Sequence, residues 1–249
     1  MSFDTPFLLA SLAALLVGLS KGGLPTIGML GVPILSLVMP PMKAAVMLLP
    51  IYVISDMVSV WLYRRHFSVV NLKILIPASI FGVFIGWLTA SYTSEAATKL
   101  LIGCIGVGFC LNVWLRKGPA TARGADLPRG MFWGTLAGFT SFISHAGGPP
   151  FQVYALPQRL PKVVFAGTAT ILFTFINLAK ILPYQLLQPY SLDDLQHASV
   201  LVPAALLGTV VGAYLTKKIA DVWFFRCVQI GLFAISIKLI ADAVSAWSL

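Results

Sequence analysis

The sequence Lys21-Gly22-Gly23-Leu24-Pro25-Thr26 interrupts the first long apolar stretch of this 249-residue chain, and His145-Ala146-Gly147-Gly148-Pro149-Pro150 interrupts another in the second half. Proline lacks the N–H that a helix interior requires, and glycine tolerates the turns that end a helix. The apolar arms beside each break extend about 20 Å or less as helix, which is too short to cross a bilayer. We therefore predict two pairs of half-length helices that meet at a break: residues 6–20 with 27–39, and residues 130–144 with 151–157.

The segments between and after these breaks are long and almost uncharged. Only 10% of the residues are charged, whereas a soluble domain carries about a quarter. The fold class predicted is therefore an all-α, polytopic membrane protein. A membrane-spanning helix needs about 20 apolar residues, and the segments that reach this length are 44–63, 74–93, 97–115, 163–187, 195–215 and 222–241.

The two halves of the chain show the same order of elements, a broken pair followed by three spans. Matching residues recur at an offset of 125 or 126: Gly22-Gly23 with Gly147-Gly148, Pro25 with Pro150, and Pro77, Gly82 and Gly86 with Pro203, Gly208 and Gly212. We predict a first transmembrane repeat over residues 1–115, a cytoplasmic linker over 116–129 and a second transmembrane repeat over 130–249. The paired glycines allow close helix contact, either within one protomer or between the protomers of a homo-oligomer.

The basic residues indicate how the repeats are oriented. With the linker in the cytoplasm, 12 basic residues fall at cytoplasmic helix ends and only Lys43 and Lys99 fall outside, as the positive-inside rule requires. This count needs each broken pair to return to its starting side, as a hairpin or as two short crossings. Each half then makes three crossings, so the repeats are inverted and both termini lie outside. Inverted repeats with broken helices are typical of secondary transporters.

The distribution of the charged residues and of the cysteines argues against nucleic-acid, metal and cofactor partners. The basic residues outnumber the acidic ones, 17 to 8, but they are scattered between apolar runs, so we expect no nucleic-acid partner. Cys104, Cys110 and Cys227 lie in apolar runs and are interpreted as packed side chains. We predict no metal site and no cofactor.

The first break contains a candidate binding site for an anion. Lys21 lies inside an apolar region, where an ionisable side chain is a functional candidate. Gly22 and Gly23 let backbone N–H groups approach a ligand, and the helix that follows presents its positive end. The alternative is a lysine that extends to the membrane interface.

The second break and the span after it contain the other candidates. His145 is either an anion donor or a proton relay, or a histidine hydrogen-bonded to carbonyl groups at the break. Asn177 and Lys180 face the same side of one helix and are predicted to line the pathway, with pairing of Lys180 to Asp56 as the structural alternative. Asp56 is thus either a counter-ion to Lys180 or a group that binds a driving proton. The other binding residues predicted here are Gly147, Gly148 and Gln152.

These motifs resemble the TauE/SafE sulfite exporter family of transmembrane anion transporters. The first-repeat signature is Gly18-Leu19-Ser20-Lys21-Gly22-Gly23-Leu24-Pro25, and the second-repeat counterpart is Ser144-His145-Ala146-Gly147-Gly148-Pro149-Pro150-Phe151-Gln152 with Asn177 and Lys180. The resemblance covers essentially the whole chain. It implies a carrier in the bacterial inner membrane that exports a small sulfur-containing anion, sulfite or an organosulfonate such as sulfoacetate.

Three other functions share parts of this pattern. An anion channel has the same composition, but paired breaks favour an alternating-access carrier. An importer of another small oxyanion is a further alternative, since export is implied by the resemblance alone. An intramembrane enzyme would use Ser141 or Ser144 with His145. Because sequence neighbours point away from each other on a helix and no third orienting group is evident, we predict that the protein is not an enzyme.

Cysteine accessibility tests the predicted topology. Cysteines introduced at positions 193 and 123 are expected to react with membrane-impermeant reagents from opposite sides, because the first position lies in an outside loop and the second in the cytoplasmic linker. Labelling of both positions from the same side contradicts the inverted-repeat prediction.

Overall fold

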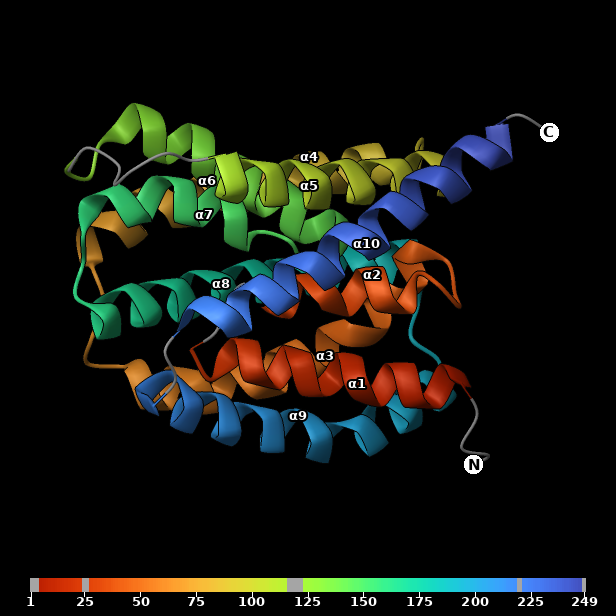
Figure 1. The fold of residues 1–249 in the computed structure, drawn as a ribbon, viewed down its shortest axis with the longest axis horizontal. Coiled ribbons are helices and arrows are strands. Elements are labelled where there is room, and N and C mark those ends of the chain that lie inside the picture. The colour runs from red at the N-terminus through yellow and green to blue at the C-terminus, as the bar shows by residue number, and fades with distance from the viewer. Residues whose placement is uncertain (1–4, 24–26, 116–122, 219–220, 248–249) are drawn as a thin grey trace.

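The structure, a computed structural model, describes residues 5–23, 27–115, 123–218 and 221–247. The prediction of an all-α protein is confirmed, because the described ranges contain helices and short connections and no strand. Figure 1 shows the helices as a bundle of roughly aligned rods. Their bounds are α1 Thr5–Lys21, η1 Ile27–Leu30, α2 Gly31–Leu35, α3 Pro41–Tyr63, α4 Val69–Ala90, α5 Glu95–Leu115, α6 Leu127–Ser144, α7 Gly148–Ala155, η2 Leu156–Gln158, α8 Lys162–Leu187, α9 Leu192–Lys218 and α10 Asp221–Trp247.

Among the described residues, six helices are long and apolar enough to cross a bilayer: α3, α4, α5, α8, α9 and α10. They coincide with the predicted spans, with small differences at the ends. For example, α4 begins at Val69 rather than at residue 74, because the Ser68 side chain accepts a hydrogen bond from the Asn71 N–H and caps the helix. The chain is a multi-pass membrane protein.

The first broken pair contains less helix than predicted. The arm after the break was expected to be helical over residues 27–39, but it consists of the 3₁₀ turn η1 and the five-residue α2. Within this arm, Gly28 lies against Ser20 and Tyr52 with little room for a side chain. Both η1 and α2 pack against α1 as a hairpin. The predicted break at Pro25 lies outside the described residues.

The second broken pair differs at its second arm. The helix begins at Gly148 rather than at residue 151, so Pro149 and Pro150 lie in the first turn of α7. Proline costs little at this position, because the first N–H groups of a helix have no partner within it. Helix α7 packs back against α6, so both broken pairs are hairpins.

The two halves of the chain are interleaved. Helix α1 of the first half packs against α9 of the second, and α6 of the second half packs against α4 of the first. The remaining long helices also pair across the halves, α3 with α8 and α5 with α10. In Figure 1 the start of α1 and the end of α10 lie at one end of the bundle, whereas α5 ends and α6 begins at the opposite end.

Glycines set the closest of these contacts. A Cβ added at Gly18 of α1 would overlap the Ala205 carbonyl of α9, and one at Gly138 of α6 would overlap the Ser79 carbonyl of α4. Gly82 and Gly208 make the reciprocal contacts. The sequence did not show whether these glycine faces pack within one protomer or between protomers. In the structure they pack within one chain.

These contacts predict how alanine substitutions act. Gly138→Ala is expected to lower the free energy of unfolding by about 1–3 kcal/mol, because the opposing backbone cannot yield to the new methyl group. Gly108→Ala on α5 is the matched control, since open space surrounds that position, and it is expected to be neutral or stabilising by up to about 1 kcal/mol. Thermal unfolding in detergent measures both. Equal stability of the two variants contradicts the close α4–α6 packing.

Candidate functional site

The end of α1 is held inside the bundle by side chains from α3. Gly23 has a left-handed backbone (φ 118°) that turns the chain after Lys21. The last carbonyl groups of a helix lack partners within it, and α3 supplies them. Ser59 Oγ donates to the Lys21 carbonyl at 3.0 Å, and Tyr63 OH lies 3.5 Å from the Gly22 carbonyl.

Helix α6 is capped at its end by His145, a residue other than glycine whose backbone has the left-handed conformation. His145 has φ 53°, a conformation that costs a non-glycine residue about 1–2 kcal/mol. Its N–H donates to the Ser141 carbonyl at 2.9 Å, and the Ala146 N–H donates to the Thr140 carbonyl at 3.3 Å. Strain of this kind collects at functional sites, and here it directs the imidazole into the bundle.

Helix α8 supplies the donors for this second helix end. Lys180 Nζ lies 3.1 Å from the Ser141 carbonyl, 3.2 Å from Ser141 Oγ and 2.6 Å from His145 Nδ1. One turn on, Tyr184 OH donates to the Phe142 carbonyl at 2.5 Å. Lys180 is completely buried, and these three acceptors match the three N–H groups of its ammonium.

The contacts of His145 fix its protonation. The Ala45 carbonyl can only accept, so His145 Nε2 must carry the ring hydrogen, and Nδ1 then accepts from Lys180 Nζ. Nε2 lies 2.9 Å from the Ala45 carbonyl of α3 and donates to it. The ring also stacks on Tyr52 with a centroid distance of 4.3 Å. His145 is therefore a neutral imidazole with both nitrogens engaged.

A buried ion pair joins the first helix end to the middle of α3. Lys21 Nζ lies 2.5 Å from Asp56 Oδ1, and the two side chains are 7% and 1% exposed. Asn177 Nδ2 of α8 donates to Asp56 Oδ2 at 2.7 Å. Asp56 thus pairs with Lys21, whereas the sequence analysis offered Lys180 as its partner. Helix α3 places the carboxylate against the end of α1, while Lys180 reaches the end of α6.

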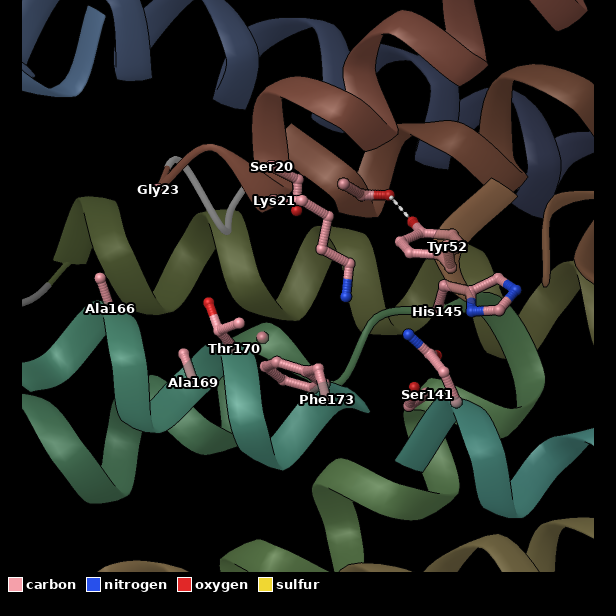
Figure 2. Close-up of a pocket in the computed structure, with 13 residues that line it drawn as sticks. Ser20, Lys21, Gly23, Tyr52, Ser141, His145, Ala166, Ala169, Thr170 and Phe173 are labelled. Carbon is pink, nitrogen blue, oxygen red and sulfur yellow. Dashed lines mark hydrogen bonds between the residues drawn. The ribbon is translucent and has the colours of Figure 1, made fainter. Parts of the chain in front are cut away.

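A cavity of about 40 Å³ lies between the two helix ends. Figure 2 shows Lys21 extending from α1 into this space, with Tyr52 and His145 on one side and Thr170 and Phe173 of α8 on the other. The lysine Nζ is 5.2 Å from the Tyr52 ring centroid, within cation–π range. The cavity is lined by Ser20, Lys21, Gly23, Gly28, Tyr52, Ser141, His145, Gly148, Ala166, Ala169, Thr170, Phe173 and Asn177.

Most of the predicted binding residues meet at this cavity, but four have other positions. Lys180 lies behind Ser141 and His145, which it holds. Gly22 packs against α9, and Gly147 packs against α6 and Phe173. Gln152 is half-buried on α7 and lies outside the set of described residues that line the cavity.

Sequence reasoning missed several lining residues that a helical period identifies. Tyr52 is one turn before Asp56 on α3. Thr170 and Phe173 precede Asn177 by seven and four residues on α8, spacings that share one face of a helix. Ser141 was considered only for an enzyme, whereas it lines the cavity and binds Lys180.

The cavity suits a small anion. It offers one ammonium, the Asn177 amide and the Ser141 and Thr170 hydroxyls, between apolar walls. A single ordered water needs at least about 10–15 Å³ measured in the same way, so the space fits a molecule of a few heavy atoms. The positive end of α7 also lies at the cavity, since Gly148 belongs to its lining.

Comparison with known proteins gave one family. A sequence model described as Sulfite exporter TauE/SafE matches residues 10–239 of the chain. The matched region contains both helix breaks and every residue of the cavity lining. No curated protein and no solved structure matches the chain.

Removal of one helix-end donor tests how the site is held. Tyr184→Phe is expected to lower the free energy of unfolding by about 1–3 kcal/mol, because the buried Phe142 carbonyl loses its partner. Tyr92→Phe is the control, since Tyr92 is 92% exposed and its loss should leave stability unchanged. Thermal unfolding measures the difference, and equal melting of the two variants contradicts the role of Tyr184.

Proposed function

The chain belongs to the TauE/SafE sulfite exporter family, and from this premise we propose that it exports sulfite, or an organosulfonate such as sulfoacetate, across the bacterial inner membrane by alternating access. The observation that carries the proposal is the buried cavity between two helix ends, with Lys21 extending into it. The size of the cavity favours sulfite over the larger sulfoacetate in the conformation described. Export rather than import follows from the family.

Each cavity residue has a proposed role in holding the anion. Lys21 supplies the positive charge, and Asn177 and Ser141 supply directed hydrogen bonds. Lys180 orients Ser141 and the neutral His145 from behind, so it acts on the anion indirectly. Residues of both halves surround the ligand, since Lys21 comes from α1 and Ser141 from α6.

The interleaved packing supports alternating access. The α1–α9 and α6–α4 pairs combine one helix from each half, and each half contributes one hairpin to the cavity. We propose that the two halves are inverted repeats over residues 1–115 and 130–249, with both termini on the periplasmic side. Rocking of one helix pair against the other would then open the cavity to either side of the membrane.

No catalytic step is part of the proposal. Ser141 Oγ accepts from the Lys180 ammonium at 3.2 Å, and Ser144 Oγ donates to the Thr140 carbonyl. These contacts support a binding role for Ser141 and a structural one for Ser144.

Sulfite flux in proteoliposomes tests the proposed function. Lys21→Met is expected to reduce flux at sub-saturating sulfite by about 30-fold or more, because loss of a buried charged partner costs about 2–5 kcal/mol. Lys180→Met should also reduce flux, since His145 and Ser141 lose their support.

Lys43→Met is the matched control for this experiment. It removes the same charge from an exposed position in the first turn of α3, and we expect wild-type flux. Wild-type flux in folded Lys21→Met and Lys180→Met proteins means that the site is assigned wrongly. Absence of flux in the wild-type protein contradicts the function itself.

A further inference from the structure

The lysine that extends into the cavity already has an anionic partner. Asp56 Oδ1 lies 2.5 Å from Lys21 Nζ, and both side chains are buried. An anion that binds Lys21 must either displace this carboxylate or lie beside it. In the second case two negative charges share one ammonium, which disfavours ionisation of one of the two anions.

If the Asp56 carboxylate is displaced from Lys21, the neighbouring groups do little to balance its negative charge. Lys21 approaches from α1, and Asn177 donates from α8. Lys180 is the other nearby basic side chain, on α8, but its N–H groups are held by Ser141 and His145. Once Lys21 turns to a substrate, the hydrogen bond from Asn177 is the contact that remains to the carboxylate.

The remaining titratable groups near Asp56 cannot replace Lys21. Tyr52 lies one turn before Asp56 on α3, and its hydroxyl donates to the Gly28 carbonyl at 2.9 Å. His145 is neutral, with its Nε2–H directed at the Ala45 carbonyl. A carboxylate that is 1% exposed and lacks a cation is costly, and such groups take up a proton instead.

We propose that Asp56 is the proton-coupling residue of this carrier: the substrate anion displaces the Asp56 carboxylate from Lys21, and one proton from water in the opened cavity binds to Asp56. Anion and proton then cross together, and the Lys21–Asp56 pair forms again after release. This inference rests on the proposed function. It assigns coupling to Asp56 rather than to His145.

Re-formation of the Lys21–Asp56 pair also explains how the empty carrier returns to the side from which it loads substrate. An unpaired Lys21 at this depth would hinder the return step, because a buried charge without a partner is strongly unfavourable. The Lys21–Asp56 pair carries no net charge, so the empty site changes its access without an exposed cation. Asp56 thus takes the place of the substrate between transport cycles.

The pH dependence of equilibrium sulfite binding to Asp56→Asn tests this inference, because a binding measurement does not depend on the return step that this variant slows. Asparagine resembles the protonated acid, so Lys21 stays available to the anion at every pH. The ratio of the wild-type Kd to the variant Kd for sulfite should rise by up to about tenfold for each pH unit, because only the wild-type carrier must take up a proton when it binds the anion. Titration of sulfite itself affects both proteins equally and cancels in the ratio.

Infrared difference spectroscopy of the wild-type protein provides a second readout that needs no variant. Addition of sulfite should produce the C=O stretching band of a protonated carboxyl group. The band should persist in Asp242→Asn, which removes an exposed carboxylate paired with Lys238, and should be absent from folded Asp56→Asn protein.

The possible outcomes separate the two proposals. If wild-type protein neither binds nor transports sulfite, the proposed function is wrong. If it transports sulfite but the Kd ratio is independent of pH and no carboxyl band forms, the function stands and the coupling role of Asp56 is wrong.

Discussion

A helix that ends inside a membrane must find partners for its last carbonyl groups within the protein, because lipid chains supply no hydrogen-bond donors. Two helices of this chain, α1 and α6, end within the bundle, and the span that follows each hairpin supplies the donors. Ser59 and Tyr63 of α3 serve the end of α1. Lys180 and Tyr184 of α8 serve the end of α6. The remaining architecture depends on this constraint, since the spans α3 and α8 are fixed against the breaks.

The same donors create the site. Lys180 satisfies the Ser141 carbonyl and, in doing so, fixes the neutral tautomer of His145. At the other helix end, Lys21 needs an anion at a depth where water is scarce, and Asp56 provides one. The site that we propose for the substrate anion thus contains a competitor, Asp56, which in this proposal keeps the empty site neutral. Structural support and transport chemistry use the same few side chains.

The sequence predicted the features that depend on local chemistry. Long apolar segments predicted the six spans, and the glycine–proline stretches placed the two hairpins. Ionisable side chains in apolar runs identified Lys21, His145 and Lys180. It did not predict the partner of Asp56, because apolar spans of similar length pack in many ways and only the contact of α3 with α1 selects Lys21. The short η1–α2 arm was also missed, since an unbroken run of apolar residues is equally compatible with a longer helix.

The most direct measurement is an experimental structure of the wild-type protein determined with sulfite. We expect density for the anion in the cavity between the ends of α1 and α6, within hydrogen-bonding distance of Lys21 Nζ, with the Lys21–Asp56 contact lengthened beyond 2.5 Å. Sulfite density elsewhere in the bundle, with the Lys21–Asp56 pair unbroken, would contradict both the proposed binding site and the proposed competition between Asp56 and the substrate.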